Sequence, residues 1–138
     1  MRNNELAADH LRRAQTRVKA IDVLFDGESW ADVVRESQEA LELALKGLLR
    51  ACGVDPPPAH DVADVLLAER GRLPEALNAQ VEQLAAASRD LRRDRELAFY
   101  GAEDLTPSSF YVKADAERAR DAVRAAVESI APFVLDAA

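Results

Sequence analysis

The chain has 138 residues, which is long enough for one well-packed hydrophobic core and too short for two domains of ordinary size. Hydrophobic residues make up 49% of it and aromatic residues only 5%, and the charged 31% are mixed in sign, a composition typical of packed helices rather than disordered chains. The net charge of −7 argues against broad electrostatic capture of nucleic acid, but it leaves room for a local arginine pocket that binds one phosphate or a short RNA segment.

Cysteine usage and hydropathy indicate the setting in which the chain works. Cys52 is the only cysteine, so no disulfide can form within the chain, and a reducing compartment fits best. The N-terminal sequence MRNNELAADHLRRAQ lacks the apolar stretch of a signal peptide, and no run of about 18 apolar residues occurs. We therefore expect a cytoplasmic protein without a membrane-spanning segment.

The first two predicted helices form an antiparallel hairpin. Apolar residues recur at helical spacing over residues 4–25, and the polar residues 26–28 end this first helix. Ser29 is expected to cap the N-terminus of the second helix, with Asp32 three residues later as the acidic partner of a capping box. The second helix ends before Gly53, which suits the C′ position. Because the break between the helices is short, they should pack side by side.

Three further helices are predicted after a proline-rich connector at residues 55–60, which cannot be helical. A short helix covers 61–70, a long helix covers 74–100 with a proline in its first turn, and the last helix covers 115–135. The sequence therefore predicts an all-α fold in one domain covering residues 1–138. The expected architecture is an up-and-down four-helix bundle with one additional short helix.

One arginine interrupts the apolar row of the third long helix. Arg95 occupies a position that the helical repeat assigns to the core, and Ser88 is the other polar residue of that row. A buried arginine is costly unless a carboxylate, a subunit interface or an anionic ligand meets it. The row consists of Leu77, Val81, Leu84, Ser88, Leu91, Arg95 and Ala98.

The neighbouring arginines, Arg89, Arg92 and Arg93, have a simpler interpretation. They are expected on the helix surface, where pairs at three- or four-residue spacing each contribute only about 0.3–0.5 kcal/mol. Some of them share a ridge with Glu96 and Tyr100, so a binding role also remains open. The expected acidic partners are Asp90, Asp94 and Glu96.

The remaining polar candidates lie on other elements. Glu42 and Lys46 stand four residues apart, and an ordinary helical ion pair is the simplest interpretation, although Gln38 or Glu42 could also face Arg95. His60 follows three prolines and is expected to cap the short helix or to anchor the loop. The two histidines and the one cysteine show no metal-ligand spacing, so no metal site is expected.

The segments SQEALELALKGLLRACG, PPPAHDVADVL and LRRDRELAFYG, followed by an amphipathic helix, resemble the HEPN domain (higher eukaryotes and prokaryotes nucleotide-binding). The similarity covers nearly the whole chain. It implies a bundle of four to five helices that is usually a homodimer, in which two signature helices come together. On this resemblance Glu42, Lys46, His60 and Asp61 are structural or supporting residues around the signature helix.

Many members of that family are metal-independent ribonucleases, and some are toxins paired with a nucleotidyltransferase. They use an arginine followed, after four to six residues, by a histidine. In this chain four residues separate Arg95 from Tyr100 and six separate Arg93 from Tyr100, so a tyrosine occupies the position of the histidine. An unperturbed tyrosine titrates near pH ~10 and a histidine near ~6.5, so the simplest inference is a weakened or lost nuclease. The second tyrosine that a nucleotidyltransferase modifies in some toxins is replaced by Ala102.

Three functions are consistent with these residues. The first is a non-catalytic homodimer that binds a nucleotide, RNA or a partner protein. The alternative is a metal-independent endoribonuclease, the toxin of a toxin–antitoxin pair, in which Arg95 and Tyr100 would be catalytic and a nucleotidyltransferase would be the partner. The third is an assembly module whose activity lies in its partner. No metal, cofactor or membrane is expected in any of them, and the expected ligand-binding residues are Arg92, Arg93, Arg95, Glu96 and Tyr100.

Overall fold

The structure, a computed structural model, describes residues 2–56, 61–100 and 110–136, and for residues 2 and 94–100 it describes the backbone alone. These residues form helices and turns without a strand, so the predicted all-α fold is confirmed. None of the described helices is both long enough and apolar enough to cross a membrane. The elements are α1 (Arg2–Asp26), α2 (Trp30–Ala51), α3 (Val62–Ala68), the 3₁₀ turn η1 (Arg70–Arg72), α4 (Glu75–Asn78), α5 (Val81–Tyr100) and α7 (Lys113–Asp136).

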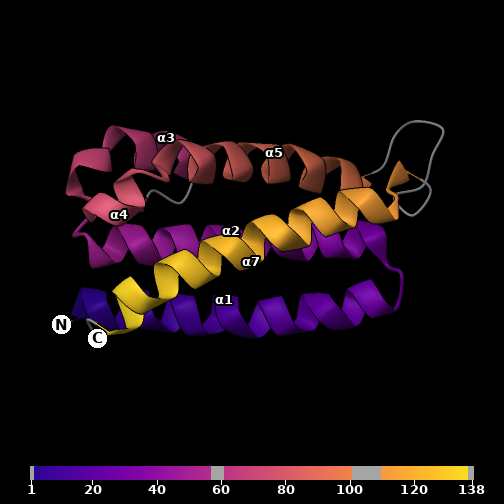
Figure 1. Ribbon diagram of the computed structural model, residues 1–138, viewed down its shortest axis with the longest axis horizontal. Coiled ribbons are helices and arrows are strands. Elements are labelled where there is room, and N and C mark those ends of the chain that lie inside the picture. The colour runs from indigo at the N-terminus through magenta and orange to yellow at the C-terminus, as the bar shows by residue number, and fades with distance from the viewer. Residues whose placement is uncertain (1, 57–60, 101–109, 137–138) are drawn as a thin grey trace.

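Helix α2 is the centre of the architecture, because the other long helices all pack against it. α1 lies along one side of α2, α5 lies along the other with α3 beside it, and α7 crosses over α1 and α2 (Figure 1). α5 and α7 scarcely touch each other, so the bundle is open between these two helices. The largest fully buried side chains are Leu11, Ile21, Leu41, Leu45, Leu48, Leu49, Leu66 and Ile130.

The α1–α2 hairpin closes through a tight turn. The backbone amides of Gly27, Glu28 and Ser29 donate to carbonyl groups of the last turn of α1, and Glu28 adopts a left-handed φ of 59°. Ser29 is the N-cap of α2 as predicted, but the predicted capping box is wrong: the Ser29 hydroxyl donates to Asp32 Oδ2 at 2.6 Å and caps no backbone amide. A hydrogen bond from a hydroxyl to a carboxylate is charge-assisted and therefore competes well with backbone capping. At the other end of α2, Gly53 has the left-handed φ (81°) expected of a C′ residue.

The two helices of the hairpin approach each other closely at Gly47 of α2. A Cβ atom added there would overlap Leu11 Cδ2 and would lie 3.1 Å from the carbonyl oxygen of Ala7. Leu11 and Ala7 are both fully buried on α1. The contact between α1 and α2 therefore depends on the absence of a side chain at this position.

Asp61 is the N-cap of helix α3, and its carboxylate accepts a hydrogen bond from the backbone amide of Ala63 at 2.9 Å. Such a cap satisfies one of the amides that an α-helix leaves unpaired in its first turn. His60, the residue that the sequence analysis expected to cap or anchor this segment, lies outside the described residues. α3 ends at Ala68, and Gly71 falls within η1 rather than directly after α3.

Removal of the α3 cap should destabilise the protein. We expect Asp61→Ala to lower the free energy of unfolding by about 1 kcal/mol, since replacing a capping side chain by Ala usually costs roughly 0.5–2 kcal/mol. Asp61→Asn retains a capping oxygen and should unfold close to the wild type. Urea denaturation followed by circular dichroism compares the three proteins. Equal losses in both variants would show that the charge of Asp61, and not its capping bond, stabilises this region.

The long helix predicted from Pro74 is divided in the structure, which corrects that prediction. α4 ends at Asn78 and α5 begins at Val81. Asn78 Nδ2 donates to the backbone carbonyl of Arg70, and Arg70 Nη2 donates to Asn78 Oδ1 at 3.3 Å, so side-chain bonding to η1 competes with continuation of the helix. The predicted buried row is nevertheless confirmed as far as the side chains are described: Leu77, Val81, Leu84, Ser88 and Leu91 are all buried.

Candidate functional site

Four charged side chains come together where α2, α3 and α5 meet. Glu42 and Lys46 come from α2, Asp61 caps α3, and Arg92 comes from α5. Lys46 Nζ lies 3.1 Å from Glu42 Oε1, and Arg92 Nη1 lies 4.0 Å from Asp61 Oδ1. The fold thus brings together residues that are distant in the sequence: Glu42 and Arg92 are 50 positions apart, and the proline-rich connector separates Lys46 from Asp61. We refer to these four residues as the seam cluster.

Gln38 fixes the orientation of Glu42 within the seam cluster. Its side chain is only 4% exposed, and its Nε2 donates to Glu42 Oε2 at 3.0 Å. Because Lys46 contacts the other oxygen, both oxygens of the Glu42 carboxylate are engaged. The Oε1 atom of Gln38 is buried and has no hydrogen-bond partner among the described residues. Glu42 is therefore held by neighbours on its own helix before any group from α5 contributes.

The surroundings of Glu42 keep its carboxyl group ionised. Partial burial acts to raise its pKa, but the hydrogen bonds from Gln38 and Lys46 and the positive charges of Lys46 and Arg92 outweigh burial, so the pKa lies below the usual range. A carboxylate with a low pKa is a poor proton acceptor near pH 7. Glu42 is therefore a negative charge that pairs with Lys46 and attracts Arg92.

Among the side chains that the structure describes, Arg89 and Arg92 pair with aspartates of the α3 segment and not with Asp90 of their own helix. Arg89 Nη2 pairs with Asp64 Oδ1, as Arg92 pairs with Asp61. The sequence predicted acidic partners within the arginine helix, and Asp64 was not among them. The spacing in the sequence could have indicated this pairing. Arg89 and Arg92 lie three residues apart, as Asp61 and Asp64 do, so the two arginines share one helix face and the two aspartates can face them together.

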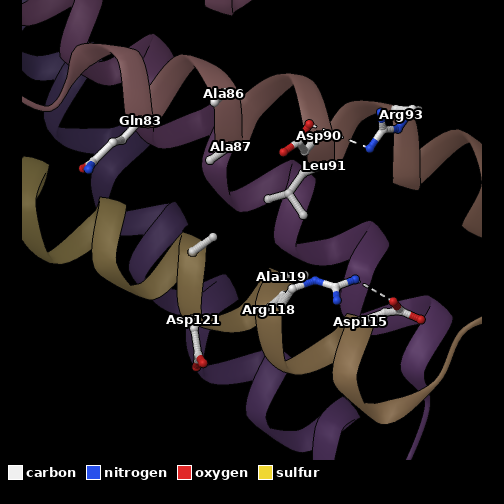
Figure 2. A pocket seen from close by; sticks show the side chains of 11 residues that line it. Gln83, Ala86, Ala87, Asp90, Leu91, Arg93, Asp115, Arg118, Ala119 and Asp121 are labelled. Carbon is white, nitrogen blue, oxygen red and sulfur yellow. Dashed lines mark hydrogen bonds and ion pairs between the residues drawn. The ribbon is translucent and has the colours of Figure 1, made fainter.

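Arg93 lies on a different surface, the groove between α5 and α7 (Figure 2). Its Nη2 lies 3.8 Å from Asp90 Oδ1, which is one of the predicted surface pairs. On the opposite wall, Arg118 pairs with Asp115 at 2.7 Å, so both walls carry mixed charge. Arg92 and Arg93 thus face different surfaces of α5. The groove has a volume of about 780 Å³ and is lined by Gln83, Ala86, Ala87, Asp90, Leu91, Arg93, Asp115, Arg118, Ala119, Asp121 and Ala122.

Several residues of the predicted site lie outside the described part of the chain. The side chains of Arg95, Glu96 and Tyr100 belong to the last turns of α5, where only the backbone is described, and His60 falls in the connector before α3. The roles of Arg95 and Tyr100 as a catalytic pair therefore stay predictions from the sequence. Among the described residues, the predicted ligand-binding residues with defined side chains are Arg92, in the seam cluster, and Arg93, in the groove between α5 and α7.

The seam cluster offers a cation for an anionic ligand. The side chain of Arg92 is 46% exposed, and its contact with Asp61 is longer than a hydrogen bond, so its guanidinium N–H groups can still donate to phosphate oxygens. Lys46 adds a second cation to the cluster and is only partly exposed. No group of three or more His, Cys, Asp or Glu side chains in the described ranges is arranged to hold a metal ion.

The comparisons with known proteins agree with this helical architecture. Residues 7–133 match the HEPN domain, a span that begins in the second turn of α1 and ends near the C-terminus of α7. No curated protein and no solved structure matches the chain. Because the family match covers the whole helical core and the seam cluster within it, the chain belongs to the HEPN domain family.

Proposed function

We propose that this HEPN protein binds a phosphate group, of a nucleotide or of RNA, at the seam cluster and does not cleave its ligand. The proposal rests on the exposure and the contacts of the Arg92 side chain. Its guanidinium group is half-exposed, lies 4.0 Å from Asp61 Oδ1 without a short hydrogen bond to it, and is close enough to Glu42 for its charge to lower the pKa of that carboxyl group. Membership of a helical family of nucleotide-binding and ribonuclease-type proteins supports a phosphate as the anion.

The two carboxylates have a positioning role in this proposal. A free arginine side chain loses rotamer entropy when it binds a ligand, and neighbouring carboxylates that orient it beforehand reduce that loss. Glu42 is itself oriented by Gln38 and Lys46, and its charge attracts Arg92 toward α2. A phosphate that accepts two hydrogen bonds from the guanidinium group would replace water there and not a buried ion pair.

Binding should depend strongly on Arg92. We expect Arg92→Gln to weaken binding of ATP, GTP or a short RNA by roughly 10- to 100-fold, since a hydrogen bond to a charged group contributes about 1.5–3 kcal/mol. Isothermal titration calorimetry in the presence of a chelator measures the affinities. The matched control is Arg72→Gln, which removes an exposed arginine paired with Glu69 on η1. Equal affinities of the two variants for each ligand would contradict the proposal.

The same mixtures decide between binding and cleavage. Labelled RNA should keep its length in chelator while it binds the wild-type protein, because a tyrosine stands in the position of the family's histidine. RNA that is shortened by the wild type, but by neither Arg95→Ala nor Tyr100→Phe, would instead establish a metal-independent ribonuclease. Growth arrest on expression, relieved by Arg95→Ala, would point to a toxin.

We also propose that the protein is a homodimer, as the resemblance to paired signature helices implies. The proposal is supported by alanine-rich helices, which allow helices of two subunits to approach closely. Sedimentation velocity over a range of protein concentrations measures the assembly state. A strict monomer at all concentrations would exclude any binding site shared between subunits and would leave the seam cluster as a site within one chain.

A further inference from the structure

Three cations on the outer face of α1 differ from the other described cations of the molecule. Arg12, Arg13 and Lys19 are exposed, and none has a carboxylate within 4.0 Å among the described residues. Every other lysine or arginine whose side chain is described has such a partner, except Lys113, which lies 6.0 Å from the centre of the Phe25 ring. In a chain with 25 acidic residues against 18 lysines and arginines, an unpaired cation is an exception. Apart from Lys113, the exceptions are therefore clustered on one face of α1.

The arrangement on α1 presents the three cations together. Arg12 and Lys19 lie seven residues apart on one ridge, about 10 Å along the helix, and Arg13 stands beside Arg12. Thr16 lies between them, but its hydroxyl donates to the backbone carbonyl of Arg12 at 3.1 Å, so the cations are the donors of this surface. A shallow concavity next to them is lined by Arg12, Arg13, Thr16 and Arg17, and Arg17 is engaged by Glu36 at 2.8 Å.

We propose that Arg12, Arg13 and Lys19 form a second contact surface for RNA, which binds the phosphate backbone of a strand whose end or loop occupies the seam cluster. This inference rests on the proposed function, namely that the protein binds RNA. None of the residues from 12 to 20 is aromatic, so the exposed side chains among them offer bases nothing to stack on and can contact the backbone only. The contact is therefore independent of base sequence.

The two surfaces belong to helices that lie on opposite sides of α2 (Figure 1). α1 packs on one side of α2 and α5 on the other (Figure 1), so the α1 surface and Arg92 are separated by the thickness of the central helix and its neighbours. A mononucleotide can occupy only one of the two surfaces, whereas a longer strand can reach both. The α1 surface should therefore contribute to the affinity for long RNA and not to the affinity for ATP.

The experiment measures how salt weakens binding of an oligouridylate of roughly 30 nucleotides, longer than the ~4–16 nucleotides that a single-strand-binding fold covers. The test variant is Arg12→Gln/Arg13→Gln/Lys19→Gln. The control is Arg72→Gln/Lys113→Gln/Arg118→Gln, which makes the same change in net charge at three exposed cations outside this surface. Arg72 and Arg118 each pair with a carboxylate, and Lys113 lies 6.0 Å from the centre of the Phe25 ring. Fluorescence anisotropy in chelator at several salt concentrations gives the affinities, and circular dichroism verifies that all proteins are folded.

We expect the slope of log affinity against log salt to become shallower by about 2 in the test variant, because each phosphate contact on a single strand contributes roughly 0.7. The control should keep the wild-type slope, and ATP affinity should be the same in all three proteins. A test variant that matches the control, while Arg92→Gln weakens binding, would overturn this inference and leave the proposed function intact. Loss in the test variant without any effect of Arg92→Gln would support the α1 surface and overturn the seam site. If the test variant loses binding to phosphatidylserine vesicles but keeps its RNA affinity, the surface binds lipid and the inference fails.

Discussion

Gly47→Val should lower the free energy of unfolding by about 2–3 kcal/mol, because the added side chain overpacks the closest contact between α1 and α2. The helix itself would gain slightly from the replacement, since glycine is a poorer helix former than valine by a few tenths of a kcal/mol. This gain is outweighed by the collision with Leu11 and the approach to the backbone of Ala7, both of which are fully buried. Urea denaturation monitored by circular dichroism measures the change.

Two controls separate steric overlap from the general effect of replacing a glycine. Gly71 in η1 has no atom within 4 Å of the position of an added Cβ, so Gly71→Val should leave the stability within about 0.5 kcal/mol of the wild type. Leu11→Ala removes the atom that collides with the new Cβ. Gly47→Ala should therefore cost less in the Leu11→Ala background than in the wild type. Strict additivity of these two substitutions would show that the helices do not meet at Gly47.

Glu42→Gln is the second substitution with a large expected effect. It removes the negative charge that holds Lys46 and attracts Arg92, and it replaces a hydrogen-bond acceptor of Gln38 by an amide. We expect a loss of about 1.5–3 kcal/mol of unfolding free energy at pH 7, the range for hydrogen bonds to charged groups. Glu117→Gln, at an exposed position of α7, should be close to neutral.

The effect of Glu42→Gln should disappear at low pH. The pKa of the Glu42 carboxyl is lowered in the folded protein, so the folded state favours the ionised form, and the stabilisation is complete above the ordinary glutamate pKa of about 4.3. It is lost as the pH falls from that value through the lower pKa of the folded state. The difference in unfolding free energy between wild type and Glu42→Gln should therefore shrink toward zero between pH 7 and strongly acidic pH. A constant difference over that range would mean that the charge of Glu42 contributes nothing.

Much of the fold follows from local patterns in the sequence. The helical repeat in α5 identified a buried row that the structure confirms from Val81 to Leu91. Gly53 was predicted at a position that needs a left-handed backbone, and its φ has the expected sign. These features depend on neighbours within about two turns, which is why sequence spacing suffices to find them.

Features that depend on contacts between distant segments were not predicted. The break between α4 and α5 reflects bonds from Asn78 to Arg70, a residue of another element, whereas the intrinsic preferences of the segment favour a continuous helix. The pairing of Arg89 with Asp64 likewise requires knowledge that α3 lies beside α5. At the candidate site, the sequence identified Arg92, Glu42 and Asp61 but not that they share one cluster and leave Arg93 on another surface.

The sparse contact between α5 and α7 should allow one part of the protein to unfold while the rest stays folded. Because α5 scarcely contacts α7, the segment from α3 to α5 is attached to the rest of the molecule almost wholly through α2. That segment can detach while α1, α2 and α7 remain packed, so its backbone amides should exchange with deuterium faster than those of α1. A ligand that bridges Arg92 and Lys46 would connect α5 to α2 and slow this exchange. The exchange rate of the amides from α3 to α5 would then measure how much of the protein has ligand bound at the seam cluster.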